Sequence, residues 1–350
     1  MIKKENAVKN VTLADIARET GFSVNTVSHA LNNKSDISEK TKSYIVDVAK
    51  RMNYITNLSA KSLRSGRTNS IAIIVGDISN PHFSIMIKEM EKRLNGYSYN
   101  AIIINTDENE EQEKKAIISA ISKNVDGIIL CPTQKSHTNI DFLNQTEIPY
   151  VLFGRRFKDI STNYVICDDI NGGFAAAEHL IRKNHKKILF INAPLYISSA
   201  IDRLEGIKNA FEKYQIDSDN LKVYEIDVTE NADRICDLLQ ENSDCTGIIC
   251  FSDIIAMQVS YFLKRQNKNV PEDVSVVGFD NIASKFYFPL MITSVSSSKT
   301  NMSVKAVECI MDKGREFYEN QDHIGQYMRS FQRADRKVRN WYPAPVYYAL

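Results

Sequence analysis

The chain has 350 residues, and its 44 Lys and Arg nearly balance 43 Asp and Glu, which gives a formal net charge of +1. This length is sufficient for two or three domains with a sizeable core. No run of about 18 apolar residues is present, so we predict neither a transmembrane helix nor a membrane partner. The N-terminal MIKKENAVKN lacks the apolar segment of a secretory signal, and the six cysteines form no C-x-x-C pair. We therefore expect a cytoplasmic protein with reduced thiols, without a metal site or a cofactor.

The charge is unevenly distributed along the chain. Residues 1–67 carry twelve Lys and Arg against six Asp and Glu, whereas the rest of the chain carries 32 and 37. A basic N-terminal segment followed by an acidic remainder predicts that the basic segment meets a polyanion.

Three stretches between residues 11 and 54 repeat apolar residues at helical spacing, around Ile16, Val27 and Val48. Gly21 lies between the first two stretches, so the pattern predicts a helix-turn-helix. Packing of Val27 against the first helix would leave short polar side chains on the outer face of the second helix. Such side chains can approach the edges of DNA bases. An ordinary helical hairpin with a solvated polar face has the same pattern.

From Ser70 onward, short apolar runs such as SIAIIVGDI, NAIIIN, KKILFIN and VSVVGF alternate with helical stretches. This alternation predicts parallel, doubly wound α/β sheets that are buried on both faces. A break near residues 160–166 separates two such series, so we expect two similar lobes. Ligands of these sheets bind beyond the carboxyl ends of the strands, which places the predicted binding crevice between the lobes.

Several segments carry a family resemblance in the same order along the chain. They are VTLADIARETGFSVNTVSHALNN, ISEKTKSYIVDVAKRMNYI, TNLSAKSLRSGRT, SNPHFS, CDDINGGFAAAEHLIRKNHKKILFI, DRLEGI, FSDIIA and VPEDVSVVGFDNI. From Val11 to about Met311, the sequence thereby resembles the Lac repressor (LacI/GalR) family of bacterial transcription regulators. The resemblance implies an all-α helix-turn-helix head and an α/β core of two doubly wound parallel-sheet lobes, similar to periplasmic binding proteins.

The resemblance also implies a division into domains. In chain order they are a helix-turn-helix DNA-binding domain at 1–56, a hinge helix and linker at 57–69, an effector-binding and dimerisation core at 70–312, and a divergent tail at 313–350. Within the core, the lobes are expected at about 70–164 and 165–296, and a helix at 300–312 returns to the first lobe. The tail lacks a final strand of the family's usual type. We therefore expect one exposed sheet edge.

In this family the second helix enters the major groove, and the hinge folds on operator DNA and wedges a leucine into the minor groove. Many members have Arg at the position of His29, and a neutral His cannot copy an Arg–guanine fork, so we expect a changed base preference there. Paired hinge helices imply a homodimer and a pseudo-palindromic operator. The matching DNA-binding positions are Thr12, Leu13, Ser23, Val24, Asn25, Thr26, Ser28, His29 and Tyr54 in the head, and Asn57, Ala60, Lys61 and Leu63 in the hinge.

The resemblance places a small effector between the lobes. An Arg, several carboxylates and an aromatic ring suit the hydroxyls and C–H faces of a sugar or a sugar phosphate. Effector binding would favour one arrangement of the lobes and thereby decide whether the hinge helices can pair on DNA. The matching effector-binding positions are Phe83, Arg155, Asp169, Arg203, Ser252, where Asn is more usual, Asp253 and Asp280.

Two other classes of protein are alternatives. A solute-binding protein of a sugar transporter shares the core, but it needs export and no DNA-binding head. An α/β enzyme is disfavoured because the chain has no G-x-G-x-x-G, G-x-x-x-x-G-K-[ST], H-E-x-x-H or G-x-S-x-G. Asp168 and Asp169 are adjacent, so in a strand they would face opposite ways and make a poor acid–base pair. We therefore expect a repressor and not an enzyme.

Overall fold

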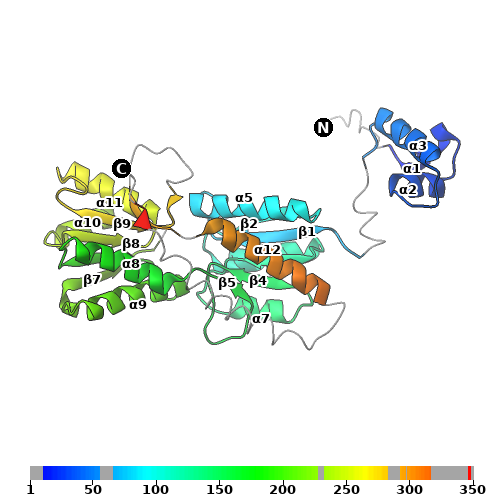
Figure 1. Cartoon of the computed structure of the whole chain (residues 1–350). Coiled ribbons are helices and arrows are strands. Elements are labelled where there is room, and N and C mark those ends of the chain that lie inside the picture. Colours follow the sequence, from blue (N-terminus) through cyan, green and yellow to red (C-terminus); the bar gives the residue numbers. More distant parts are fainter. Residues whose placement is uncertain are drawn as a thin grey trace, which may run out of the picture. The chain divides into compact units, whose positions relative to one another are not determined.

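The computed structural model describes residues 11–55, 66–227, 232–282, 292–296, 298–316 and 346–347. The chain divides into two compact units, Met1–Thr68 and Asn69–Leu350 (Figure 1). Within the described residues, no helix combines the length and the apolar character that are needed to cross a membrane.

The first unit is a bundle of three short helices. Each helix begins at a hydroxyl side chain, since Thr12, Ser23 and Ser38 each accept a hydrogen bond from the N–H three residues later. Ile16 and Val27 are fully buried where the helices meet. The helices are α1 (Leu13–Thr20), α2 (Val24–Leu31) and α3 (Glu39–Arg51).

The first lobe of the second unit is a parallel five-stranded sheet with the order β2-β1-β3-β4-β5. The inner strand β1, SIAIIV, is buried along nearly its whole length because helices cover both faces of the sheet. The elements are β1 (Ser70–Val75), α5 (Pro81–Gly96), β2 (Asn100–Asn105), α6 (Glu110–Ser122), β3 (Gly127–Leu130), α7 (Thr138–Asn144), β4 (Tyr150–Phe153) and β5 (Tyr164–Val165).

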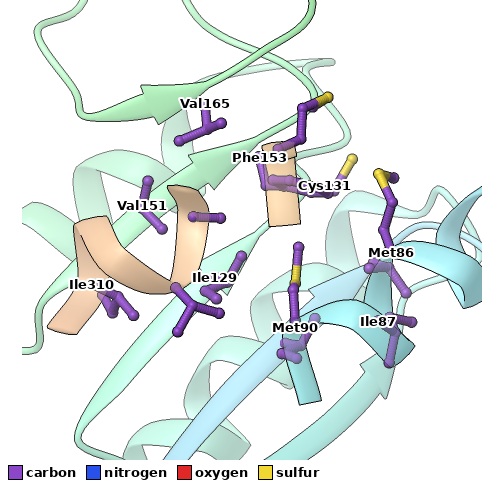
Figure 2. Packing of buried hydrophobic residues seen from close by; sticks show 14 of the residues in the cluster. Met86, Ile87, Met90, Ile129, Cys131, Val151, Phe153, Val165 and Ile310 are labelled. Carbon is purple, nitrogen blue, oxygen red and sulfur yellow. The ribbon is translucent and has the colours of Figure 1, made fainter. Parts of the chain in front are cut away.

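The last long helix, α12 (Lys299–Glu316), follows the second lobe in sequence but packs beside α5 on the first lobe (Figure 1). Ile310 of α12 belongs to the same buried cluster as Ile129 and Val151 of the sheet and Met90 of α5 (Figure 2). The chain therefore passes between the lobes three times: after β5, before α12, and again between α12 and residues 346–347, which pair in the sheet of the second lobe.

The second lobe is a six-stranded sheet with the order β11-β10-β9-β8-β6-β7, parallel except at β11. Apart from β11, this order repeats that of the first lobe. The prediction of a helical head and two doubly wound lobes is confirmed. The elements are α8 (Asp169–Arg182), β6 (Ile188–Asn192), α9 (Ser198–Lys213), the 3-10 helix η1 (Ser218–Asn220), β7 (Leu221–Glu225), α10 (Ala232–Glu241), β8 (Gly247–Cys250), α11 (Asp253–Arg265), β9 (Ser275–Phe279) and β10 (Thr293–Val295).

The sheet edge that we expected to be exposed is paired. The short strand β11 (Val346–Tyr347) runs antiparallel to β10, with Tyr347 opposite Ser294 and Val346 opposite Val295. The prediction that the tail supplies no strand is therefore wrong at these two residues. Main-chain pairing needs no particular motif, and both residue types favour extended backbone.

Helices α8 and α9 approach each other closely because two glycines face the backbone of the opposite helix. A Cβ on Gly173 would lie 2.1 Å from the carbonyl oxygen of Arg203, and a Cβ on Gly206 would lie 1.9 Å from that of Ile170. Only glycine fits at either position. The contact holds α9, and with it Arg203, against the rest of the second lobe.

We expect Gly206→Ala to lower the free energy of unfolding of the second unit by about 2 kcal/mol or more, because the two helix backbones must separate. Gly96→Ala is the matched control, since a Cβ at this end of α5 meets nothing within 4 Å. The control should keep the free energy of unfolding or raise it by up to ~1 kcal/mol. Urea denaturation followed by circular dichroism measures both, and equal stabilities would contradict the prediction.

Candidate functional site

Helix α2 presents an exposed face at its N-terminal end. Ser23, Val24 and Asn25 are exposed, and 47% of Val24 is accessible to solvent. Ser23 Oγ accepts a hydrogen bond from the Thr26 N–H at 3.1 Å and lies 2.8 Å from the Thr26 hydroxyl. Short side chains around a helix N-terminus suit contacts with base edges and with phosphate.

Ser28 departs from its prediction. The sequence pattern placed it on the outward face of α2, but it is only 8% exposed. The reason is that Asn32 folds back over the helix, where its Nδ2 donates to the carbonyl oxygen of Ser28 at 2.8 Å. A small side chain is easily covered in this way by the C-cap of its own helix, so the expected exposure of Ser28 is wrong.

His29 lies in the last turn of α2 and has a loop residue as its partner. Its Nδ1 is 2.6 Å from Asp36 Oδ2. The loop after α2 folds back because Asn33 adopts a left-handed φ of 59°, and the N–H of Lys34 donates to the carbonyl oxygen of His29 at 3.0 Å. Asp36 is absent from the predicted set because a partner seven positions away in a loop leaves no periodic signal.

The remaining predicted DNA-binding positions have different surroundings. Thr12 is exposed and caps α1, whereas Leu13 and Tyr54 are half-buried against the core of the bundle. Partial burial raises the pKa of Tyr54 above its ordinary value. The predicted hinge residues lie outside the described residues; they are Asn57, Ala60, Lys61 and Leu63.

In the second unit, a cavity of about 160 Å³ lies where strand ends of the two lobes meet. The first lobe contributes the segment after β1 and the start of α5. The second lobe contributes the segment after β7, one face of α10 and the start of α11. The lining combines the polar residues Asp77, Ser79, Asn80, Asp227, Arg234, Ser252 and Gln258 with Pro81, Ile226, Ile235, Ile254 and Ile255.

Arg203 is buried in the second lobe and joins three of its elements. Its Nε donates to Asp169 Oδ1 at 2.8 Å, and its Nη1 donates to the carbonyl oxygen of Phe251. The guanidinium carbon is 4.4 Å from the ring centroid of Phe251 and 4.2 Å from that of Phe279. Burial opposes the charge of Arg203, but the carboxylates of Asp169 and Asp280 outweigh it and raise the pKa of Arg203. Burial also raises the pKa of Asp169, and Arg203 offsets this in part.

Asp253 is 2% exposed and holds two backbone segments together. Its Oδ2 accepts a hydrogen bond from the Ile282 N–H at 2.8 Å, and its Oδ1 accepts one from the Ser294 hydroxyl at 2.6 Å. Gly278 makes room for it, since a Cβ there would lie 2.3 Å from Oδ1. Burial, together with the nearby Asp280, raises the pKa of Asp253 to about 7.

Arg155 forms an ion pair inside the first lobe. Its two terminal nitrogens donate to both carboxylate oxygens of Glu108 at 2.7 and 2.9 Å, and Nη1 also donates to the carbonyl oxygen of Pro132 at 2.8 Å. Gly76 leaves space for this pair, since a Cβ there would lie 2.1 Å from Glu108 Oε1. Phe83 is also buried in this lobe, in the cluster beneath α5 and α12.

The first contact across the lobes joins His82 at the start of α5 to Asp280 after β9. His82 Nδ1 is 3.1 Å from Asp280 Oδ1, but the two groups are not aligned as a hydrogen bond. Burial lowers the pKa of His82 against the opposing charge of Asp280, and Lys299, Arg203 and Arg155 lower it further. Asp280 has a φ of 94°, an uncommon conformation for a non-glycine residue, and its carbonyl oxygen accepts a hydrogen bond from Lys299 Nζ.

The second contact across the lobes joins the segment after β4 to the start of α9. Asp202 is buried in the second lobe, and Arg156 Nη2 lies 2.9 Å from its Oδ2. Lys158 Nζ lies 3.4 Å from the other carboxylate oxygen. The Arg156 N–H donates to Ser198 Oγ at 3.1 Å, and the Ser198 N–H donates to Gln134 Oε1 at 2.9 Å. Two cations of the first lobe thus face one buried carboxylate of the second.

Other acidic groups do not form a metal-binding cluster in the part of the chain that is described. No three His, Cys, Asp or Glu side chains in that part are arranged to hold a metal ion. Asp168 caps α8 and Asp169 is the first residue of that helix, so the assumption that the two lie in a strand is wrong.

Two family models match the chain. The model of bacterial regulatory proteins of the lacI family matches residues 12–57. The model of periplasmic binding proteins and the sugar binding domain of the LacI family matches residues 68–325, which is well over half of the chain. The chain belongs to the LacI family. A solute-binding protein of a transporter would have no counterpart of α1 to α3, so that alternative is not favoured.

Individual relatives of this LacI-family protein agree with the assignment. The HTH-type transcriptional regulator RegA of Clostridium saccharobutylicum is 34% identical over 304 residues, which are 86% of this chain and 91% of that one. The HTH-type transcriptional repressor PurR of Actinobacillus pleuropneumoniae serotype 3 is 28% identical over 305 residues, 86% and 90% of the two chains. The fold is similar to that of a chain in the structure of the Lac repressor dimer bound to operator and an anti-inducer, with a TM-score of 0.77 at 21% identity over 89% of this chain and 94% of that one. The protein is a DNA-binding transcriptional regulator.

Four of the seven predicted effector positions of this LacI-family regulator lie close together in the second lobe, namely Asp169, Arg203, Asp253 and Asp280, whereas Phe83 and Arg155 lie within the first lobe. Asp169 and Arg203 form a pair within the second lobe, and Arg155 is paired within the first. Among the described residues, Ser252 is the one predicted position in the cavity lining. His82 was not predicted, although NPHFS places it directly before Phe83 at the carboxyl end of β1.

The raised pKa of Asp253 makes stability depend on pH. The folded protein holds this proton more tightly than the unfolded chain, whose ordinary value is 3.8, so the contribution to stability is complete below about pH 4 and is lost as the pH rises through about 7. Asp253→Asn keeps an oxygen that accepts from the Ile282 N–H, and its Nδ2 can donate to the Ser294 hydroxyl oxygen, without the charge. We expect the free energy of unfolding of this variant, relative to wild type, to increase from pH 4 to pH 8, by roughly 4 kcal/mol at most.

Urea denaturation at several pH values measures this difference. The control is Asp244→Asn, which removes a carboxylate from an exposed surface pair with Lys187. A difference between Asp253→Asn and wild type that stays constant with pH would contradict the prediction.

Proposed function

We propose that this LacI-family protein represses transcription as a homodimer on a pseudo-palindromic operator in the cytoplasm, and that a small carbohydrate bound between its lobes changes its operator affinity. The observation that carries the proposal is a cavity between the lobes in a chain whose other unit exposes a short polar helix face. In this function the protein acts by binding and not by catalysis. The names of RegA and PurR, which match over most of both chains, support it.

On the DNA side, α2 is the recognition helix of the proposal. Ser23, Val24, Asn25 and Thr26 meet the major groove, and His29 reads a base near the C-terminal end of the helix. The exposure of Ser23, Val24 and Asn25, the partial exposure of the other two residues, and the excess of Lys and Arg in residues 1–67 support this assignment. Thr12, Leu13 and Tyr54 frame the helix, and the hinge contact rests on the sequence match at Asn57, Ala60, Lys61 and Leu63.

On the effector side, the cavity lining favours a neutral polyol. Asp77 and Asp227 bring two carboxylates and Arg234 brings one guanidinium, while hydroxyl and amide side chains supply further donors and acceptors. Isoleucine side chains give the apolar surface that the C–H faces of a sugar need. A phosphate group would meet two negative charges here, so we favour an unphosphorylated sugar.

The contacts across the lobes suggest how a ligand acts at a distance. His82–Asp280 and Asp202 with its two cations form only when the lobes are close, so they define a closed arrangement. A ligand that prefers this arrangement shifts the population toward it. In a dimer that shift changes the spacing of the two heads and thereby the operator affinity.

The proposal is tested by selecting duplexes from a randomised DNA pool with the full-length protein and by screening sugars for thermal stabilisation. We expect a pseudo-palindromic consensus, and a sugar that raises the Tm by about 5 °C at a hundredfold excess over its Kd. That sugar should change operator affinity at least fivefold, and Gln258→Ala in the cavity should weaken its binding. Absence of any enriched duplex, or a sugar that binds without changing operator affinity, would contradict the proposal.

We expect Asp202→Asn to favour the open arrangement, because it removes the negative charge that Arg156 and Lys158 share across the lobes. The radius of gyration of the core in small-angle scattering should increase, and sugar affinity should fall by about threefold to tenfold. Asp244→Asn is the matched control, since the Lys187–Asp244 pair lies within one lobe. Equal scattering and sugar affinity for the two variants would show that the Asp202 contact does not govern closure.

A further inference from the structure

The loop partner of His29 provides an inference about base recognition, which rests on the proposed role of α2 as the recognition helix. Asp36 Oδ2 lies 2.6 Å from His29 Nδ1, and the two side chains are 57% and 34% exposed. The loop that carries Asp36 is held to the end of α2 by the Lys34 N–H on the carbonyl oxygen of His29. The carboxylate is therefore presented to the imidazole by a loop that is held to the end of α2.

This contact decides which atom of the imidazole is free. A ring nitrogen that faces a carboxylate carries its proton, so Nδ1 of His29 is the donor. The other nitrogen, Nε2, then has a lone pair and accepts hydrogen bonds while the ring is neutral. Without a partner at Nδ1, the ring could rotate about its side-chain bonds and exchange the two nitrogens.

We propose that Asp36 is a positioning residue for base recognition. It holds the His29 ring so that Nε2 meets the major-groove edge as an acceptor. The groups that can donate to it there are the exocyclic amino groups of adenine, N6, and of cytosine, N4. Asp36 touches no base in this scheme and acts only through His29.

A competing explanation is that Asp36 acts only through its charge. An exposed carboxylate beside the DNA-binding face repels phosphates and weakens binding to every sequence by a similar factor. Positioning, in contrast, changes the preference at a single base step and leaves the other steps alone. Substitutions of Asp36 separate the two because Asn removes the charge but keeps an oxygen that can accept from Nδ1–H, whereas Ala removes both.

The test is duplex selection from a randomised pool with the full-length protein, followed by affinity measurements on duplexes that differ at one step of each half-site. For wild type we expect one base pair to be preferred by about fivefold at the step read by His29, and this preference to be lost when the exocyclic amino group of that pair is absent, as with purine in place of adenine or 2-pyrimidinone in place of cytosine. Asp36→Ala should reduce this preference to less than about twofold. Asp36→Asn should retain it, and in a His29→Ala background Asp36→Ala should have no further effect.

Asp47→Ala, at an exposed acid of α3, is the control for charge alone. A uniform gain of affinity in both Asp36 variants, without a change of preference, would overturn the positioning role. A preference that survives removal of the exocyclic amino group at the His29 step would overturn the acceptor assignment of Nε2. If the wild-type protein enriches no duplex, the proposed function itself fails. If the wild-type protein enriches a duplex and Asp36→Ala shows the same base preference at the His29 step, only the inference about Asp36 fails.

Discussion

The second lobe depends on one buried cation. Arg203 projects from α9 and reaches Asp169 at the start of α8, the carbonyl oxygen of Phe251 at the end of β8, and the ring of Phe279 at the end of β9. A guanidinium can serve all of these because its donors form a planar fork and its face accepts an aromatic ring. Removal of the cation would leave the Asp169 carboxylate buried without a partner, which is far more costly than the loss of a surface pair.

Because of this network, Arg203 has fewer hydrogen-bond donors left for a ligand in the cleft. Two of the donors of Arg203 are already satisfied within the protein, so a ligand gains only what remains accessible. The same is true of Asp253, because its two oxygens already accept hydrogen bonds from the Ile282 N–H and the Ser294 hydroxyl. These side chains shape the strand ends on which the cleft is built, while Ser252 and Gln258 from the adjoining helix line the cavity itself. Specificity for a sugar would then lie more in the lining than in the buried charges.

The helical head and the α/β alternation were predictable because both rest on local patterns. The apolar spacing around Ile16 and Val27 predicts helices, and SIAIIV between helical stretches predicts a buried parallel strand. The partners of individual side chains were not predictable in this way. Arg155 and Glu108 are far apart in sequence and meet only because β4 and the segment after β2 end at the same edge of one sheet. Ser28 failed for a different reason, since helical periodicity does not include a side chain that folds back from the C-cap.

The two lobes repeat one strand order, and that repeat places equivalent elements against each other. Helix α5 follows β1 in the first lobe as α9 follows β6 in the second, and the start of each contacts the opposite lobe after the equivalent strand, β9 or β4. The chemistry at these two places differs. His82 is buried and its pKa is lowered, so it meets Asp280 as a neutral ring, whereas Asp202 meets two cations. The contact between the lobes at the start of α9 is therefore strongly electrostatic, whereas the contact at the start of α5 is weak. The cavity lies beside the start of α5, so a ligand would enter at the side where the least has to be displaced.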